Sequence, residues 1–142
     1  MKRIVCLLLV GILLCASVVP VSATEDTTIS PRFTYISSTA TGFRIDTEPG
    51  VAVCYAKCET YSESVTIKIV GSLQQYKSSQ WTQIASWTVS GTGGLVILDR
   101  LKAVSKGYNY RFVATYYIYN SAGTLLESSS ATRYYSYPDN NT

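Results

Sequence analysis

The chain has 142 residues, a formal net charge of +3 and no histidine. So small an excess of basic residues does not indicate a nucleic-acid partner, which needs clustered cations. The absence of histidine excludes the Ser–His and Cys–His pairs that activate nucleophiles. The abundance of Tyr, Ser, Thr and Val favours β-strands.

The first 23 residues have the pattern of a cleavable secretory signal. Lys2 and Arg3 precede an apolar run over residues 4–15, and small residues at 21–23 suit a signal peptidase. The apolar run is shorter than the roughly 20 residues that cross a bilayer, so a single-pass anchor is the weaker alternative. We therefore expect a secreted protein that is not inserted in a membrane after cleavage near Thr24.

Cleavage also changes the cysteine content and the charge. Only Cys54 and Cys58 remain, and ten basic residues then face nine acidic ones. On a regular strand the two thiols share a face, with Cα atoms about 13 Å apart, beyond the roughly 7 Å that a disulfide allows. Buried thiols are favoured, while a local or an intermolecular disulfide stays open. Two cysteines without histidine are half a zinc site at best, so we expect no metal and no cofactor.

Alternating apolar and polar residues, separated by turn-forming residues, predict seven strands. They span residues 33–46 (interrupted), 51–59, 65–76, 82–89, 95–99, 108–119 and 124–136. Only residues 99–105 could form a short helical turn. The sequence therefore predicts a flexible lead (24–31), one all-β sandwich domain (32–137) and a disordered tail (138–142).

The segment Gly107–Ala114, with Leu101 before it, resembles the corner between the fifth and sixth strands of fibronectin type III and immunoglobulin-like domains. The resemblance implies that Tyr110 folds back and hydrogen-bonds the preceding loop, with Leu101 packed beneath it. Tyr108 is the alternative for this role. Phe112 stands where the immunoglobulin cysteine would be, so we expect a core held by packing alone.

Several short motifs are spread along the mature chain: Leu73-Gln74-Gln75-Tyr76, Trp81, Ser86-Trp87, Lys106-Gly107 with Tyr110-Arg111, and Glu127-Ser128. Together they resemble landmarks of small secreted proteins of Gram-positive gut bacteria such as clostridia. The resemblance implies a signal peptide, one all-β domain and a bacterial source. It implies no catalytic residues.

Tyrosines of the last two predicted strands are the main functional lead. Tyr117 and Tyr119 fall on the side opposite the expected core, Tyr135 and Tyr137 share one side of the next strand, and Tyr134 takes the other. On neighbouring strands such residues form cross-strand pairs. An exposed aromatic strip can stack on sugars or bind a partner, although tyrosines can also simply coat a stable sheet.

We therefore expect a secreted, non-enzymatic, monomeric module that binds a glycan or a protein surface. Tyr117, Tyr119, Tyr135 and Tyr137 would form its face, and polar contacts would come from Arg111 or Arg133. Trp81 and Trp87, spaced for one strand face, are expected in the core.

Two other functions remain open. The chain could be a self-assembling extracellular subunit, linked through its thiols or an open sheet edge. A hydrolase is the more distant possibility, because the nearest carboxylate pair, Asp46 and Glu48, falls beside a Pro-Gly turn where exposure is expected.

Overall fold

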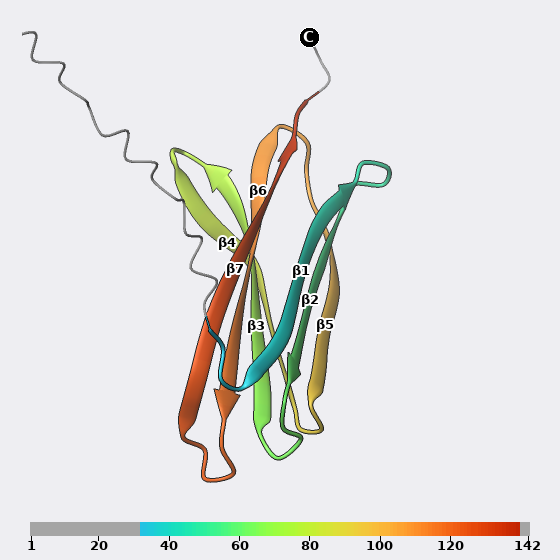
Figure 1. Cartoon of the computed structure of the whole chain (residues 1–142). Coiled ribbons are helices and arrows are strands. Elements are labelled where there is room, and N and C mark those ends of the chain that lie inside the picture. Colours follow the sequence, from blue (N-terminus) through green and yellow to red (C-terminus); the bar gives the residue numbers. More distant parts are fainter. Residues whose placement is uncertain (1–31, 140–142) are drawn as a thin grey trace, which may run out of the picture. The chain divides into compact units, whose positions relative to one another are not determined.

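A computed structural model describes residues 32–139, which form a sandwich of seven antiparallel strands without a helix (Figure 1). The all-β sandwich predicted from the sequence is confirmed. The strands are β1 (Ile36–Asp46), β2 (Val51–Thr60), β3 (Thr66–Lys77), β4 (Gln80–Gly91), β5 (Leu95–Ala103), β6 (Tyr108–Tyr119) and β7 (Leu125–Tyr137). The predicted signal peptide (1–23), the lead (24–31) and residues 140–142 of the predicted tail lie outside the described residues.

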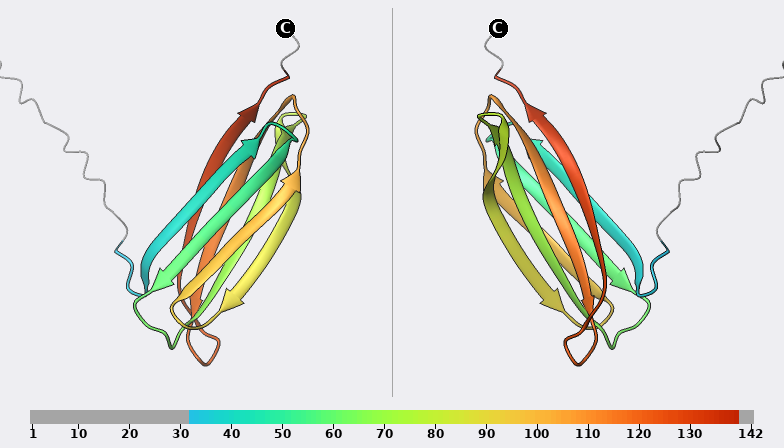
Figure 2. Two further views of the ribbon diagram at one scale, coloured as in Figure 1. Left: turned by 90° about the vertical axis from the view of Figure 1, so that its right-hand side faces the viewer. Right: turned by 90° about the vertical axis from the view of Figure 1, so that its left-hand side faces the viewer.

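The strands form two sheets, in the orders β1-β2-β5 and β4-β3-β6-β7. Figure 2 shows the two layers packed face to face, with β1 beside β7 at one side and β5 beside β4 at the other. Each strand alternates between a side chain facing the other sheet and one facing away. The molecule therefore has one core and two outer faces, one on each sheet.

Both thiols lie in the core. Cys54 and Cys58 alternate with outward residues of β2, are fully buried and are not bonded to each other. Burial raises the pKa of Cys54 to about 12 and that of Cys58 to about 11. Both stay protonated at neutral pH, and a folded domain cannot use them to link two copies.

Tyr110 makes the hydrogen bond that its place in the sequence implies. Its hydroxyl donates to the carbonyl oxygen of Ser105 over 2.7 Å and accepts from the Ser105 N–H over 3.1 Å. The side-chain amide of Gln75 donates to the same oxygen over 3.1 Å. Gly107 closes this corner in a left-handed conformation (φ 88°), with its N–H bonded to the Tyr137 carbonyl oxygen.

The expectation that Leu101 packs beneath Tyr110 is wrong, because Leu101 is 66% exposed. The reason is that β5 continues to Ala103, paired with Val51 of β2, where the sequence suggested a helical turn. Val96 and Leu98 face the core, so Leu101 falls on the alternate, outward side of the same strand.

A β-bulge divides β4. Pairing with β3 passes from Leu73 opposite Ala85 directly to Gln74 opposite Gln83, so Ile84 has no partner across the strand. Ile84 and Ala85, although adjacent, both pack against the core. An extra residue of this kind exchanges the two sides of the strand beyond it.

The bulge separates the two tryptophans that the sequence put on one side. Trp87 lies opposite Gly71 and packs against the core, as predicted. Trp81 lies beyond the bulge, opposite Tyr76, on the outer face of the four-stranded sheet. The prediction that Trp81 belongs to the core is therefore wrong.

Candidate functional site

The tyrosine strip predicted from β6 and β7 does not form. Tyr117 and Tyr119 face outward, with ring centroids 6.4 Å apart. Tyr135, however, lies opposite the buried Tyr110, and Tyr137 is itself buried. Tyr135 and Tyr137 therefore lie on the core side of β7, and Tyr134, between them and Arg133 in the sequence, lies on the outer face.

The two predicted arginines are also separated. Arg111 is on the outer face of the four-stranded sheet, in contact with Trp81. Arg133 lies at the β7 edge, where its Nε donates to the carbonyl oxygen of Thr41 on β1 over 3.2 Å. Arg133 thus joins the edges of the two sheets and does not complete a site with Arg111.

Four outward side chains instead gather at one end of the four-stranded sheet, around Trp81. The Trp81 ring lies 5.1 Å from the Tyr76 ring and 5.9 Å from the Tyr134 ring, measured between centroids. The guanidinium carbon of Arg111 lies 4.5 Å from the centre of the Trp81 ring. Tyr134 is 66% exposed and Tyr76 40% exposed, so solvent reaches this group. We call Tyr76, Trp81, Arg111 and Tyr134 the Trp81 patch.

The β3–β4 hairpin positions half of this patch. Its two-residue turn, Ser78-Ser79, has positive φ at both residues (52° and 63°), a conformation that usually selects Asn-Gly. Tyr76 and Trp81 face each other across the strands near this turn. A cross-strand aromatic pair stabilises a hairpin by about 0.2–1 kcal/mol, which helps to offset the unfavourable turn residues.

A hollow of about 240 Å³ adjoins the patch. Its lining residues are Trp81, Asn109, Tyr110, Tyr134, Tyr135 and Ser136. Asn109 and Ser136 lie opposite each other on β6 and β7, next to the rings. The hollow thus combines aromatic walls with an amide and a hydroxyl group that can exchange hydrogen bonds with a ligand.

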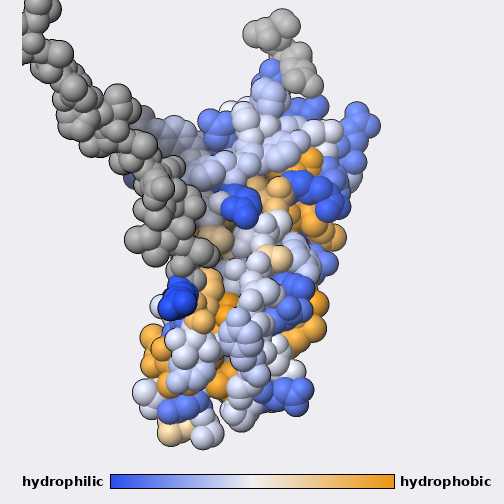
Figure 3. Space-filling view, in the orientation of Figure 1, coloured by the Kyte–Doolittle hydropathy of each residue, from blue (hydrophilic) through white to orange (hydrophobic). Residues whose placement is uncertain are grey.

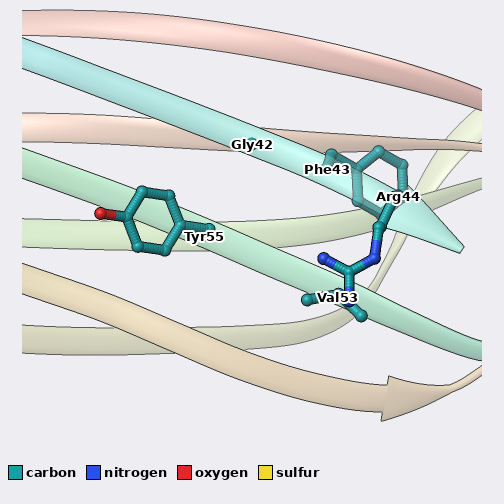
Figure 4. A pocket seen from close by; sticks show the side chains of 5 residues that line it. All are labelled: Gly42, Phe43, Arg44, Val53 and Tyr55. Carbon is teal, nitrogen blue, oxygen red and sulfur yellow. The ribbon is translucent and has the colours of Figure 1, made fainter.

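The three-stranded sheet has a hollow of about 300 Å³ on its outer face, beside Gly42 (Figure 4). Figure 4 shows Tyr55 and Val53 of β2 beside Arg44 of β1, with no side chain at Gly42. The Nε of Arg44 already donates to Asp46 over 3.0 Å. Arg44, the cation that lines this hollow, therefore already has Asp46 as its counter-ion.

A third hollow, of about 390 Å³, lies among loops at the other end of the domain and includes Ser62, Ser64 and Asn120 in its lining. Three of its polar side chains are already engaged: the two serine hydroxyls bond each other, and the Asn120 Oδ1 accepts the N–H groups of Ala122 and Thr124. Of the three hollows, the one beside Trp81 offers the most polar groups without described protein partners.

Exposed aliphatic side chains mark the outer face of the three-stranded sheet. Leu95, Ile97 and Leu101 alternate along β5 and are each about half exposed or more. In Figure 3 apolar residues (orange) are visible along the side of the molecule where β1, β2 and β5 lie. This face contrasts with the aromatic patch of the other sheet.

The sequence interpretation missed Tyr76, Trp81 and Tyr134 as site residues. Strict alternation along residues 81–89 assigns Trp81 and Trp87 to the same side of the strand and does not predict the bulge at Ile84. The available signal is Ile84, an apolar residue on the side that alternation makes polar. An apolar residue out of phase beside the apolar set is what a bulge leaves in a sequence.

Asp46 and Glu48 are exposed, and the Asp46 carboxylate is taken up by Arg44. Across residues 32–139 no three His, Cys, Asp or Glu side chains cluster as a metal site. The same part of the chain contains no helix that could cross a membrane.

No protein-family profile matches the chain, and a search of curated proteins finds no match either.

Proposed function

We propose that this protein is a secreted, non-enzymatic binding module that holds a glycan on the Trp81 patch and in the adjoining hollow. The observation that carries the proposal is the exposed corner formed by Trp81 and Tyr134, whose rings meet at 61°. Aromatic rings supply large rigid contact areas, and tyrosine adds a polar group at its tip. Such a surface suits sugar rings, which have apolar faces and polar rims.

The hollow supplies the polar contacts that a sugar needs. In the proposed complex one sugar ring packs on Tyr134, and its hydroxyl groups bond Asn109 and Ser136. The site is shallow and open, which suits a chain of sugars crossing the sheet rather than a small molecule enclosed in a pocket.

The proposed type of sandwich, the secretion and the bacterial source are supported by the sequence and the strand order together. The 3 + 4 arrangement and the Tyr110 corner support a fibronectin type III or immunoglobulin-like type of sandwich. The pattern of residues 1–23 supports secretion, and the motif resemblance supports a Gram-positive bacterial source.

The test is binding of the purified protein to a glycan array, followed by calorimetry on any ligand found. Tyr134→Ala, an exposed position, should lower the affinity about tenfold or more, as removal of a stacking ring does. Tyr117→Ala and Tyr119→Ala remove matched tyrosines from the other end of the same outer face and should leave binding unchanged. Binding that survives Tyr134→Ala together with Trp81→Ala contradicts the proposal.

Self-association is the second candidate, favoured by the exposed aliphatic row on β5, an edge strand. Edge strands offer unpaired backbone groups to a second chain. Because the thiols are buried, such association would be noncovalent. Size-exclusion chromatography with and without reductant tests it: a monomer under both conditions argues against assembly.

A further inference from the structure

Arg111 is held in place by neutral groups. Its Nε donates to the Oε1 of Gln74 over 2.7 Å, and its guanidinium group lies over Trp81. A guanidinium group carries five N–H donors, of which the contact with Gln74 uses one. Among residues 32–139 no described hydrogen bond or ion pair engages the two terminal nitrogens of Arg111.

The sheet that carries Arg111 is poor in acidic residues. Its four strands contain one acidic side chain, Glu127, and four basic ones, Lys68, Lys77, Arg111 and Arg133. The Glu127 carboxylate accepts the backbone N–H groups of residues 34–36 and is not available to Arg111. The charge of Arg111 is therefore uncompensated by its own sheet.

Two of the four cations of the three-stranded sheet serve as an internal comparison. There Arg44 pairs with Asp46 and Lys57 pairs with Glu59, each over 3.0 Å. Those two cations are neutralised by residues two positions further along the same strands. Arg111, half-buried among aromatic rings where charge interactions are stronger than in water, has no such neighbour.

We propose that the ligand of the Trp81 patch is an acidic glycan, one whose sugars carry a carboxylate group. The proposal rests on the proposed function and specifies its ligand class. The carboxylate accepts two parallel hydrogen bonds from the two terminal nitrogens of Arg111, a geometry that arginine favours. Because the guanidinium group lies over the Trp81 ring, a carboxylate bound to it places its sugar ring beside the patch. Gln74 accepts the Arg111 Nε–H and so helps to hold the guanidinium group over the ring.

The experiment compares oligogalacturonate with neutral galacto-oligosaccharide of the same length, by calorimetry at low and high salt. We expect the acidic oligosaccharide to bind about tenfold more tightly at low salt, the effect of one charge-assisted bidentate contact. Added salt should reduce this preference by screening. Arg111→Gln should remove the preference for the acidic oligosaccharide.

Two variants separate recognition from net charge and from folding. Lys68→Gln removes a cation from the same outer face, opposite Tyr117, and should leave the preference intact. Arg111→Lys keeps the charge but loses the planar fork, so its preference should fall most of the way to that of Arg111→Gln. Urea unfolding of each variant checks that the domain is folded.

The outcomes are distinct. Equal binding of acidic and neutral oligosaccharides, unchanged by Arg111→Gln, overturns the acidic-glycan proposal and leaves the proposed function standing. Tighter binding of a sulfated than of a carboxylated oligosaccharide overturns the carboxylate assignment. Absence of binding to any saccharide overturns the proposed function itself.

Discussion

The outer faces of the two sheets differ in their exposed apolar side chains and in how their cations are paired. On the three-stranded sheet Arg44 is paired with Asp46 and Lys57 with Glu59, and the most exposed large apolar side chains, those of β5, are aliphatic. On the four-stranded sheet the surface around Trp81 is aromatic, and Arg111 lies over the Trp81 ring without an acidic partner. On the first face Arg44 and Lys57 have their counter-ions within the chain. The second leaves a fixed cation for which a ligand can supply the counter-ion.

The bulge at Ile84 is the structural origin of this difference. Without it, Trp81 would face the core and Arg111 would have no ring to lie on. With it, the end of β4 presents an aromatic side chain outward while the rest of the strand keeps Ala85 and Trp87 against the core. One extra residue thus places Trp87 against the core and Trp81 on the outer face.

The largest expected effect on stability separates those two tryptophans. Trp87→Ala should lower the free energy of unfolding by about 3 kcal/mol, because it leaves a cavity against the core. Trp81→Ala should lower it by about 1 kcal/mol, because its partners are half-exposed rings on the outer face. Urea unfolding measures both, and an equal loss for the two variants would contradict the division made by the bulge.

A pair of glycines tests the inner surface against the outer one. A Cβ added at Gly71 would lie 2.9 Å from a ring carbon of Phe112 and 3.2 Å from Leu98, so Gly71→Ala should cost about 2 kcal/mol through overpacking. A Cβ at Gly42 would meet Tyr55 at 3.5 Å, an ordinary contact. Gly42→Ala should therefore be neutral or stabilising by about 0.5 kcal/mol in thermal unfolding. A destabilised Gly42→Ala variant would show that the outer hollow is not free space.

Glu127 is a second difference between the sheets. It is the only carboxylate on the strands of the four-stranded sheet, and it binds the backbone at the start of β1 instead of pairing with a cation. It accepts three backbone N–H groups at 2.8–2.9 Å. Glu127→Gln keeps an acceptor oxygen but loses the charge, and should cost about 1.5 kcal/mol. A loss below the error of urea unfolding at neutral pH would contradict this role.

The same carboxylate gives a pH dependence with a definite sign. Burial raises the pKa of Glu127, but the three backbone hydrogen bonds outweigh this and lower it below the ordinary 4.5. A lowered folded-state pKa stabilises the fold above about pH 4.5, and this stabilisation is lost as the pH falls through the folded-state value. The difference in unfolding free energy between wild type and Glu127→Gln should therefore shrink on acidification; a constant difference would contradict the assignment.

The sequence predicts most of this architecture because alternation is a reliable signal where a strand is regular. Strand β2 and the inner side of β6 follow it without interruption, and both thiols are buried as the spacing implies. The site was misplaced for two physical reasons. The bulge at Ile84 shifts the phase of β4, and the β6–β7 register places Tyr135, not Tyr134, on the side of Tyr110.

The smallest expected effect concerns the aliphatic face of β5. Leu101→Ser and Ile97→Ser each replace a side chain that is about half exposed or more, so each should change the free energy of unfolding by no more than about 0.5 kcal/mol. A loss of 2 kcal/mol or more would mean that this face is covered in the folded state, and the only chain present in a purified sample is a second copy of the protein. The stability would then also rise with protein concentration, since association stabilises the folded form by mass action. Concentration-independent unfolding together with near-neutral serine variants would argue against association of two copies through this face.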